Sequence, residues 1–115
     1  MAFDNLQTLD IIEIMNRFLE SIRPPESIRD QLDIGYLIEE NSILIVEIRP
    51  QWNNPEIISQ TPVAKTTFIK SKYHWKVFWM KSDLKWHNYT PKPFVSNLKS
   101  FTKLVQEDKH CCFFG

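Results

Sequence analysis

The stretch from Asp33 to Arg49, DIGYLIEENSILIVEIR, decides the fold that we expect. Two apolar runs flank a polar interruption, and each run suits a β-strand, in which successive side chains point to opposite faces. We predict a β-hairpin with a three-residue turn, Glu39, Glu40 and Asn41, in which Asn41 takes the left-handed conformation. With that turn, one face of the hairpin carries the core residues Leu32, Ile34, Tyr36, Ile38, Leu44, Val46 and Ile48.

Charged residues gather at one end of the other face of this hairpin. The three-residue turn places Asp33 directly opposite Glu47, with Arg49 beside them. Two carboxylates and one cation leave a net negative charge, which a divalent metal such as Mg²⁺ or Mn²⁺ would compensate. The alternative is a structural ion pair between Arg49 and one carboxylate. A two-residue turn would separate the cluster, because a slip of one residue moves side chains to the other face.

The composition is typical of one globular domain over residues 1–115. Of the 115 residues, 43% are hydrophobic and 13% aromatic, which is enough to bury a core. The N-terminus does not resemble a secretory signal, and no apolar run is long enough to cross a membrane. Cys111 and Cys112 are adjacent, which excludes a disulfide framework. These features predict a cytoplasmic protein without a membrane partner.

Charge is distributed unevenly along the chain. Residues 1–60 carry a formal charge of −7, whereas residues 61–103 carry nine lysines against Asp83 alone, for a charge of +8. Lysines interleaved with aromatic residues are typical of surfaces that contact a phosphate backbone. The C-terminal half is therefore a candidate nucleic-acid surface. The alternative is that this charge meets the acidic half, within the chain or in a dimer.

The segment before the hairpin predicts a helix, and the segment after it is ambiguous. Asp4 is an N-cap for an apolar helical pattern that Pro24 and Pro25 end, and residues 25–30 form a short helical turn. In residues 61–72 the β-branched residues favour a strand, whereas Pro62 favours the start of a helix. We favour the helix, which would bring Lys65 near the end of the hairpin.

Two more strands and a final helix complete the expected order. Residues 73–80, YHWKVFWM, are apolar on both faces and predict a central strand covered on each side, and residues 84–89 predict the next strand. Ser96 or Asn97 caps a final helix that runs to Asp108. The apolar C-terminal tail should dock on the core, and Trp52 should cover its edge.

Nearly the whole chain resembles a family of small bacterial proteins known as Domain of Unknown Function 3024. The resemblance rests on the motifs LDIGY (32–36), EIRPQW (47–52), PVAK (62–65), WKVFWMKSDLKWH (75–87) and CFFG (112–115). The resemblance to this family implies no particular activity.

A more distant resemblance is to the P-D…(D/E)-x-K nuclease superfamily, whose folds are restriction-endonuclease-like. It rests on Asp33, the hairpin, and Glu47 followed two residues later by Arg49. The resemblance implies that Asp33 and Glu47 are metal ligands, with Arg49 at the position of the superfamily's lysine. Arg49 does not deprotonate in proteins, so Lys65 would substitute for that lysine in catalysis. An acid of the first helix, Glu13 or Glu20, would complete the set.

We therefore expect an α+β domain with the order helix, hairpin, ambiguous segment, two strands and helix, possessing a nuclease-like site. An active enzyme would hydrolyse phosphodiesters with Mg²⁺ or Mn²⁺. The alternative is a non-catalytic module for protein interaction or self-association. The catalytic hypothesis requires that residues 61–71 be helical and that Asp33 face Glu47.

Overall fold

The computed structural model describes residues 3–110 and 112–114. Its elements follow the order α1 (Asn5–Ile22), η1 (Glu26–Ile28), β1 (Asp33–Glu39), β2 (Ser42–Pro50), β3 (Ile58–Ile69), β4 (His74–Met80), β5 (Trp86–Asn88), β6 (Phe94–Val95) and α2 (Leu98–Glu107). Two helices and a six-stranded antiparallel sheet confirm the α+β class.

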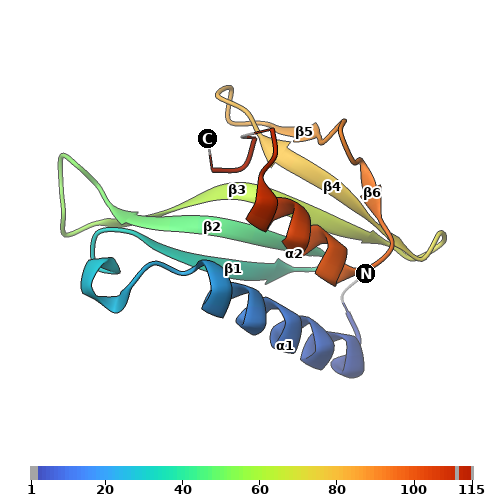
Figure 1. The fold of residues 1–115 in the computed structure, drawn as a ribbon. Helices are drawn as coiled ribbons and strands as arrows, with labels where there is room; N and C mark the ends of the chain where they lie inside the picture. The colour runs from blue at the N-terminus through green and yellow to red at the C-terminus, as the bar shows by residue number, and fades with distance from the viewer. Residues whose placement is uncertain (1–2, 111, 115) are drawn as a thin grey trace.

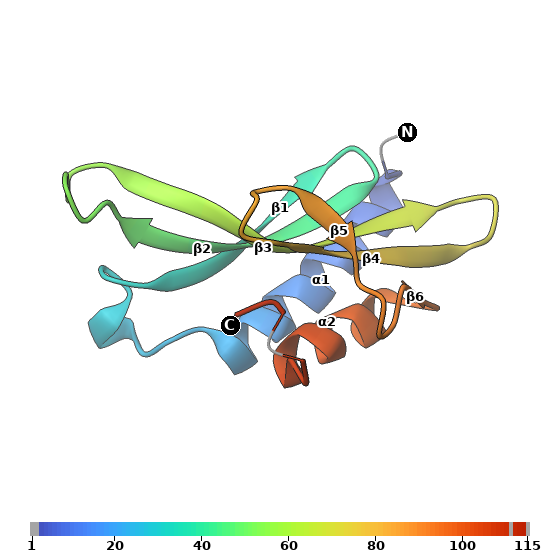
Figure 2. The same cartoon turned by 90° about the horizontal axis from the view of Figure 1, so that it is seen from above.

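The sheet is a meander with both helices on one side. The strands pair in the order β1-β2-β3-β4-β5, and β6 also pairs with β4, all antiparallel. Figures 1 and 2 show α1 and α2 side by side across one face of the sheet. Within the described residues no helix covers the other face, which we call the open face. No helix of the described residues is long and apolar enough to span a membrane.

Both predicted helices form where their caps indicated. The Asp4 side chain accepts a hydrogen bond from the backbone N–H of Gln7, which in turn caps the Asp4 backbone. The helix α1 ends before Pro24, and η1 forms the expected short turn. Asn97 caps α2 by accepting from the backbone N–H of Ser100 at 2.8 Å.

The prediction of a helix in residues 61–72 was wrong, because these residues belong to the long strand β3. The register between β2 and β3 shifts after Ile45, so that Ile45 pairs with Ala64 and Val46 with Pro62. Val63 is the extra residue of this β-bulge. Proline is tolerated in a sheet at a bulge because no ladder hydrogen bond is required of it there. Pro62 therefore marks a bulge and not a helix start.

The three-residue turn was also wrong. Glu39 pairs with Ser42, so the turn consists of Glu40 and Asn41, and Glu40 has the positive φ of 49°. Asn41 is held instead by β3, since its carbonyl accepts from the N–H of Phe68 (2.8 Å) and its amide donates to the Phe68 carbonyl (3.2 Å). The register moves by one residue as a result. Ile43 and Ile45 face the helices, while Leu44 and Val46 lie on the open face.

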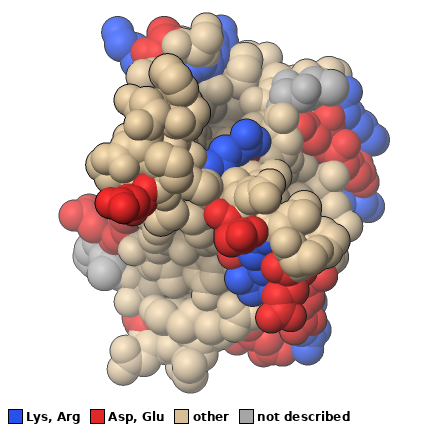
Figure 3. Space-filling model, turned by 90° about the vertical axis from the view of Figure 1, so that its left-hand side faces the viewer, with Lys and Arg blue, Asp and Glu red and all other residues tan. Residues whose placement is uncertain are grey.

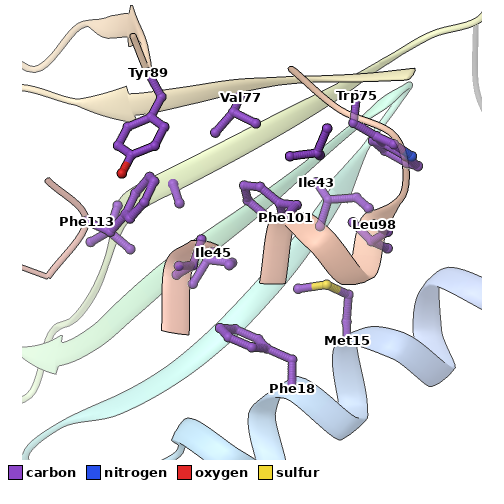
Figure 4. Close-up of a cluster of buried hydrophobic side chains, with 14 of the residues drawn as sticks. Met15, Phe18, Ile43, Ile45, Trp75, Val77, Tyr89, Leu98, Phe101 and Phe113 are labelled. Atoms are coloured by element: carbon purple, nitrogen blue, oxygen red, sulfur yellow. The ribbon is translucent and has the colours of Figure 1, made fainter. Parts of the chain in front are cut away.

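The core lies between the sheet and the two helices (Figure 4). Met15 and Phe18 of α1 and Phe101 of α2 pack against the strands. The C-terminal tail docks as expected: the Phe113 ring centroid lies 4.8 Å from that of Tyr89. Asp108 holds this tail by accepting from the N–H groups of Phe113 and Phe114 at 3.1 and 2.9 Å.

Two expectations about coverage need correction. Trp52 does not cover the core, because it is 94% exposed in the loop between β2 and β3. Figure 3 looks onto the end of the molecule from which this loop projects, and charged side chains of both signs lie scattered among the tan surface there. The strand β4 is central, but only Trp75, Val77 and Trp79 face the helix side; Phe78 and Met80 are half-buried on the open face.

Candidate functional site

Asp33 is part of an ion pair that the sequence did not reveal. Arg23, the C-cap of α1, donates from Nε and Nη2 to its two carboxylate oxygens, each at 2.7 Å. The N–H of Ile34 donates to the same carboxylate at 2.8 Å. The hydrogen bonds from Arg23 lower the pKa of Asp33 from 3.8 to about 2, against the opposing effect of burial, and the Ile34 N–H contributes further. Asp33 is thereby held as a carboxylate.

Glu47 makes a second, separate ion pair. Arg49 donates to Oε2 of Glu47 from Nη2 at 2.8 Å and from Nε at 3.0 Å. Asp33 pairs with Ile48, and Glu47 pairs with Ile34, so the side chains of Asp33 and Glu47 lie on opposite faces of the sheet. The expected juxtaposition of Asp33 with Glu47 was therefore wrong, as a consequence of the two-residue turn.

This geometry does not suit the expected metal site. The described residues contain no group of three or more His, Cys, Asp or Glu side chains arranged to hold a metal ion. Glu13, a candidate third acid, pairs with Arg17 at 2.8 Å on the exposed side of α1, and Glu20 is also exposed. Cys111 lies outside the described residues. Each hairpin carboxylate is instead paired with its own arginine, Asp33 with Arg23 and Glu47 with Arg49.

Lys65 lies on the open face, away from both ion pairs. It pairs with Leu44 on one side and Phe78 on the other. Its Nζ atom lies 4.8 Å from the ring centroid of Phe78 and 5.0 Å from that of Trp86. Both distances are typical of cation–π contacts. Burial lowers the pKa of Lys65, and the carboxylate of Glu39 opposes this shift.

The open face combines further aromatic rings with lysines. Lys76 lies with its Nζ atom 5.2 Å from the Phe78 ring. At the other end of β4 the His74 ring stacks on Phe94, with the centroids 4.4 Å apart and the planes inclined by 26°. We define the aromatic–lysine surface as Lys65, His74, Lys76, Phe78, Trp86 and Phe94. In Tyr73–Met80, alternate side chains lie on the two faces of the sheet, so the sequence contained the information needed to place these aromatic residues on one face. The expectation that both faces of this strand are covered left no exposed aromatic face to predict.

The other lysines of the basic segment lie around this surface and elsewhere. Lys70 and Lys72 lie in or beside the β3–β4 turn, and Lys81 and Lys85 flank the β4–β5 turn. In that turn Asp83 pairs with His87 at 2.8 Å, which lowers the pKa of Asp83. By contrast, α2 carries two exposed lysines on the helix side of the molecule, Lys99 and Lys103. The basic segment is thus divided between the two sides of the sheet.

A hollow of about 290 Å³ opens on the open face beside the β1–β2 turn. It is lined by Glu39, Glu40, Asn41, Ser42, Leu44, Lys65 and Trp86. It therefore contains an aromatic ring, a cation and two carboxylates, which could bind a flat, polar group. Non-local pairing brings these residues together from four strands and a turn, and the sequence did not indicate it.

The chain matches a family model over almost its entire length. No curated protein and no solved structure matches it. The matching model, Domain of unknown function (DUF3024), covers residues 3–115. The chain therefore belongs to the DUF3024 family.

Proposed function

We propose that this protein is a non-catalytic module that binds single-stranded nucleic acid on the open face of its sheet. The observation that carries the proposal is the placement of Lys65 and Lys76 among exposed and half-buried aromatic rings on a sheet face without a helix. Charge complementarity indicates the partner, because residues 61–97, which precede α2, carry seven lysines against Asp83 alone, for a formal charge of +6.

The chemistry of the surface suits a single strand better than a duplex. Lysine ammonium groups bind phosphates and release counterions, which gives affinity without sequence preference. Aromatic rings on a sheet can stack on bases that are not paired, and this stacking is worth about 1–3 kcal/mol per base. The bases of a duplex are already stacked on each other and do not reach such a surface.

The nuclease hypothesis receives no comparable support. It required residues 61–71 to be helical, and they are in β3. It also required Asp33 to face Glu47, and each is paired with a different arginine. A binding role for the basic half does not depend on either condition.

A charge-neutralising double variant tests the proposal. Binding of a fluorescein-labelled single-stranded oligonucleotide is measured by anisotropy over a range of salt concentrations. We expect Lys65→Gln/Lys76→Gln to weaken binding and to reduce the slope of log K against log salt by up to about 1.4, at about 0.7 for each phosphate that a lysine no longer neutralises. The matched control is Lys99→Gln/Lys103→Gln, which removes the same charge from α2 and should leave the slope unchanged.

If the two double variants weaken binding equally, the oligonucleotide is attracted by the overall charge of the protein. That result would contradict binding at the aromatic–lysine surface. Absence of binding to the wild-type protein at low salt would overturn the proposal itself.

A second candidate function, self-association, rests on an apolar strip on α1. Leu6 and Leu9 are 77% and 64% exposed, and Ile12 follows at the same spacing. A second copy of the chain could cover this strip through its own α1. Strand β1 is a poorer contact for a second copy, because antiparallel self-pairing would bring Asp33 near Glu39 of the partner copy. Light scattering of the wild type and of Leu9→Glu tests this: a dimer that the variant converts to a monomer would support it, and a wild-type monomer would contradict it.

A further inference from the structure

We propose that the hollow beside the β1–β2 turn is a base pocket that prefers a nucleobase with an amino group, cytosine over uracil. The inference rests on the proposed function, since it specifies what the open face recognises. Phosphate contacts alone carry no sequence information, whereas contacts to the edges of bases do.

The floor of the pocket is an aromatic ring that a base can stack on. Trp86 lies in β5, half-buried, with the Lys65 Nζ atom 5.0 Å from its ring centroid. The lysine thus lies over the ring, in the position that a stacked base would take. A lysine side chain is flexible and compact in charge, so it can leave the ring and bind the phosphate of the incoming nucleotide. The ring and the cation would then contact different parts of one nucleotide.

The wall of the pocket is acidic, and this argues against a bare phosphate as the ligand. Glu39 pairs with Ser42 at the end of β1 and lies on the same face as Lys65, close enough to affect its pKa. Glu40 lines the same hollow. Two carboxylates repel a phosphate that enters the hollow itself. They are good acceptors for an amino group, because a carboxylate accepts from the N4 amino group of cytosine.

Neighbouring polar groups in the pocket fit the same ligand. The amide nitrogen of Asn41 donates to the Phe68 carbonyl at 3.2 Å, which leaves its amide oxygen to accept from a ligand. The Ser42 hydroxyl is bonded to that of Thr67 at 2.7 Å. The wall therefore offers mainly acceptors. Uracil has a carbonyl oxygen where cytosine has its amino group, so it would place an acceptor against Glu39.

The experiment compares two ligands that differ at this edge of the base, where cytosine has the N4 amino donor and the N3 acceptor and uracil has the O4 acceptor and the N3–H donor. Labelled deoxycytidine and deoxyuridine oligomers of equal length are titrated with the wild type, with Glu39→Gln and with the control Glu20→Gln. Glu20→Gln makes the same charge change on the exposed side of α1. We expect the wild type and Glu20→Gln to bind the cytosine oligomer roughly tenfold more tightly, the effect of one hydrogen bond to a charged group. Glu39→Gln should lose this preference, because a glutamine amide can accept from cytosine or donate to uracil.

The outcomes separate the base pocket from the proposed function. If the wild type binds both oligomers equally and Glu39→Gln tightens both equally, the open face binds nucleic acid but the base pocket is wrong. If Glu39→Gln retains the cytosine preference, Glu39 does not read the base and the inference is overturned. If the wild type binds neither oligomer, the proposed function fails, and the inference fails with it.

Discussion

Arg23 and Asp33 join the end of the first helix to the start of the first strand through two parallel hydrogen bonds of 2.7 Å. The pair connects two segments on either side of η1, ten residues apart in sequence. Asp33 is 16% exposed and Arg23 39% exposed, so the pair lies at the border of the solvent. It uses both oxygens of a carboxylate that we had expected to bind a metal.

The stabilising effect of this pair should depend on pH. The pKa of Asp33 falls from 3.8 to about 2 in the folded state, so its contribution is present above pH 3.8 and is lost as the pH falls towards about 2. We expect Asp33→Asn to lower Tm by a few degrees, about 2–5 °C, at pH 7. The difference between wild type and variant should shrink in melting curves recorded between pH 4 and about pH 2.

The control for this prediction is Glu13→Gln. The pair of Glu13 with Arg17 has side chains 63% and 70% exposed, and such pairs contribute little. A Tm difference for Asp33→Asn that stays constant down to pH 2 would show that the carboxylate charge is not what the variant removes.

Divalent metals should not stabilise the fold through the hairpin. A ligand that binds only the native state raises Tm by mass action, and a site formed by Asp33 and Glu47 would show this effect. Because these two carboxylates lie on opposite faces of the sheet, we expect no rise in Tm with millimolar Mg²⁺ or Mn²⁺. A rise in the wild type that disappears in Asp33→Ala would contradict this and restore the metal site.

Elements fixed by local signals could be predicted from the sequence. Asp4 and Asn97 cap the two helices through bonds to residues three positions away, and Pro24 ends the first helix, so the information lies within a few residues. The hairpin was predictable for the same reason. Its register was not, because Asn41 is positioned by Phe68, which lies 27 residues further along the chain.

The candidate site could be predicted only in its composition. Lysines and aromatic residues were evident in residues 61–103, but their division between two faces depends on strand pairing. The strand β3 was missed because Pro62 resembles a helix start when its bulge is not known. A helix in residues 61–72 would not place Lys65 opposite Phe78, whereas the strand β3 does. Asp33 was likewise misjudged because its partner, Arg23, comes from another element.

Substitutions in the two-residue turn should have opposite effects. Glu40 has a φ of 49°, where a side chain costs energy and glycine does not. We expect Glu40→Gly to stabilise the fold by about 0.5 kcal/mol after the entropy of glycine is deducted. Asn41→Gly loses the hydrogen bond to the Phe68 carbonyl and should destabilise by about 1 kcal/mol in urea unfolding. Glu40→Ala removes the same carboxylate but keeps a Cβ atom, so an equal gain from it would contradict the backbone explanation.

Phe101 should be among the most costly core residues to truncate. Its side chain has 0% exposure and lies between α1 and the sheet in the centre of the core (Figure 4). We expect Phe101→Ala to lower the free energy of unfolding by about 3–5 kcal/mol, because it removes a large apolar side chain and leaves a cavity that the surrounding strands cannot fill. Trp52→Ala is the control: Trp52 is 94% exposed in the loop between β2 and β3, so its truncation should change stability by about 0.5 kcal/mol or less. Urea unfolding of both variants measures the difference. A loss below about 1 kcal/mol for Phe101→Ala would mean that α2 does not pack on the sheet as described, since a well-packed phenylalanine cannot be removed at so small a cost.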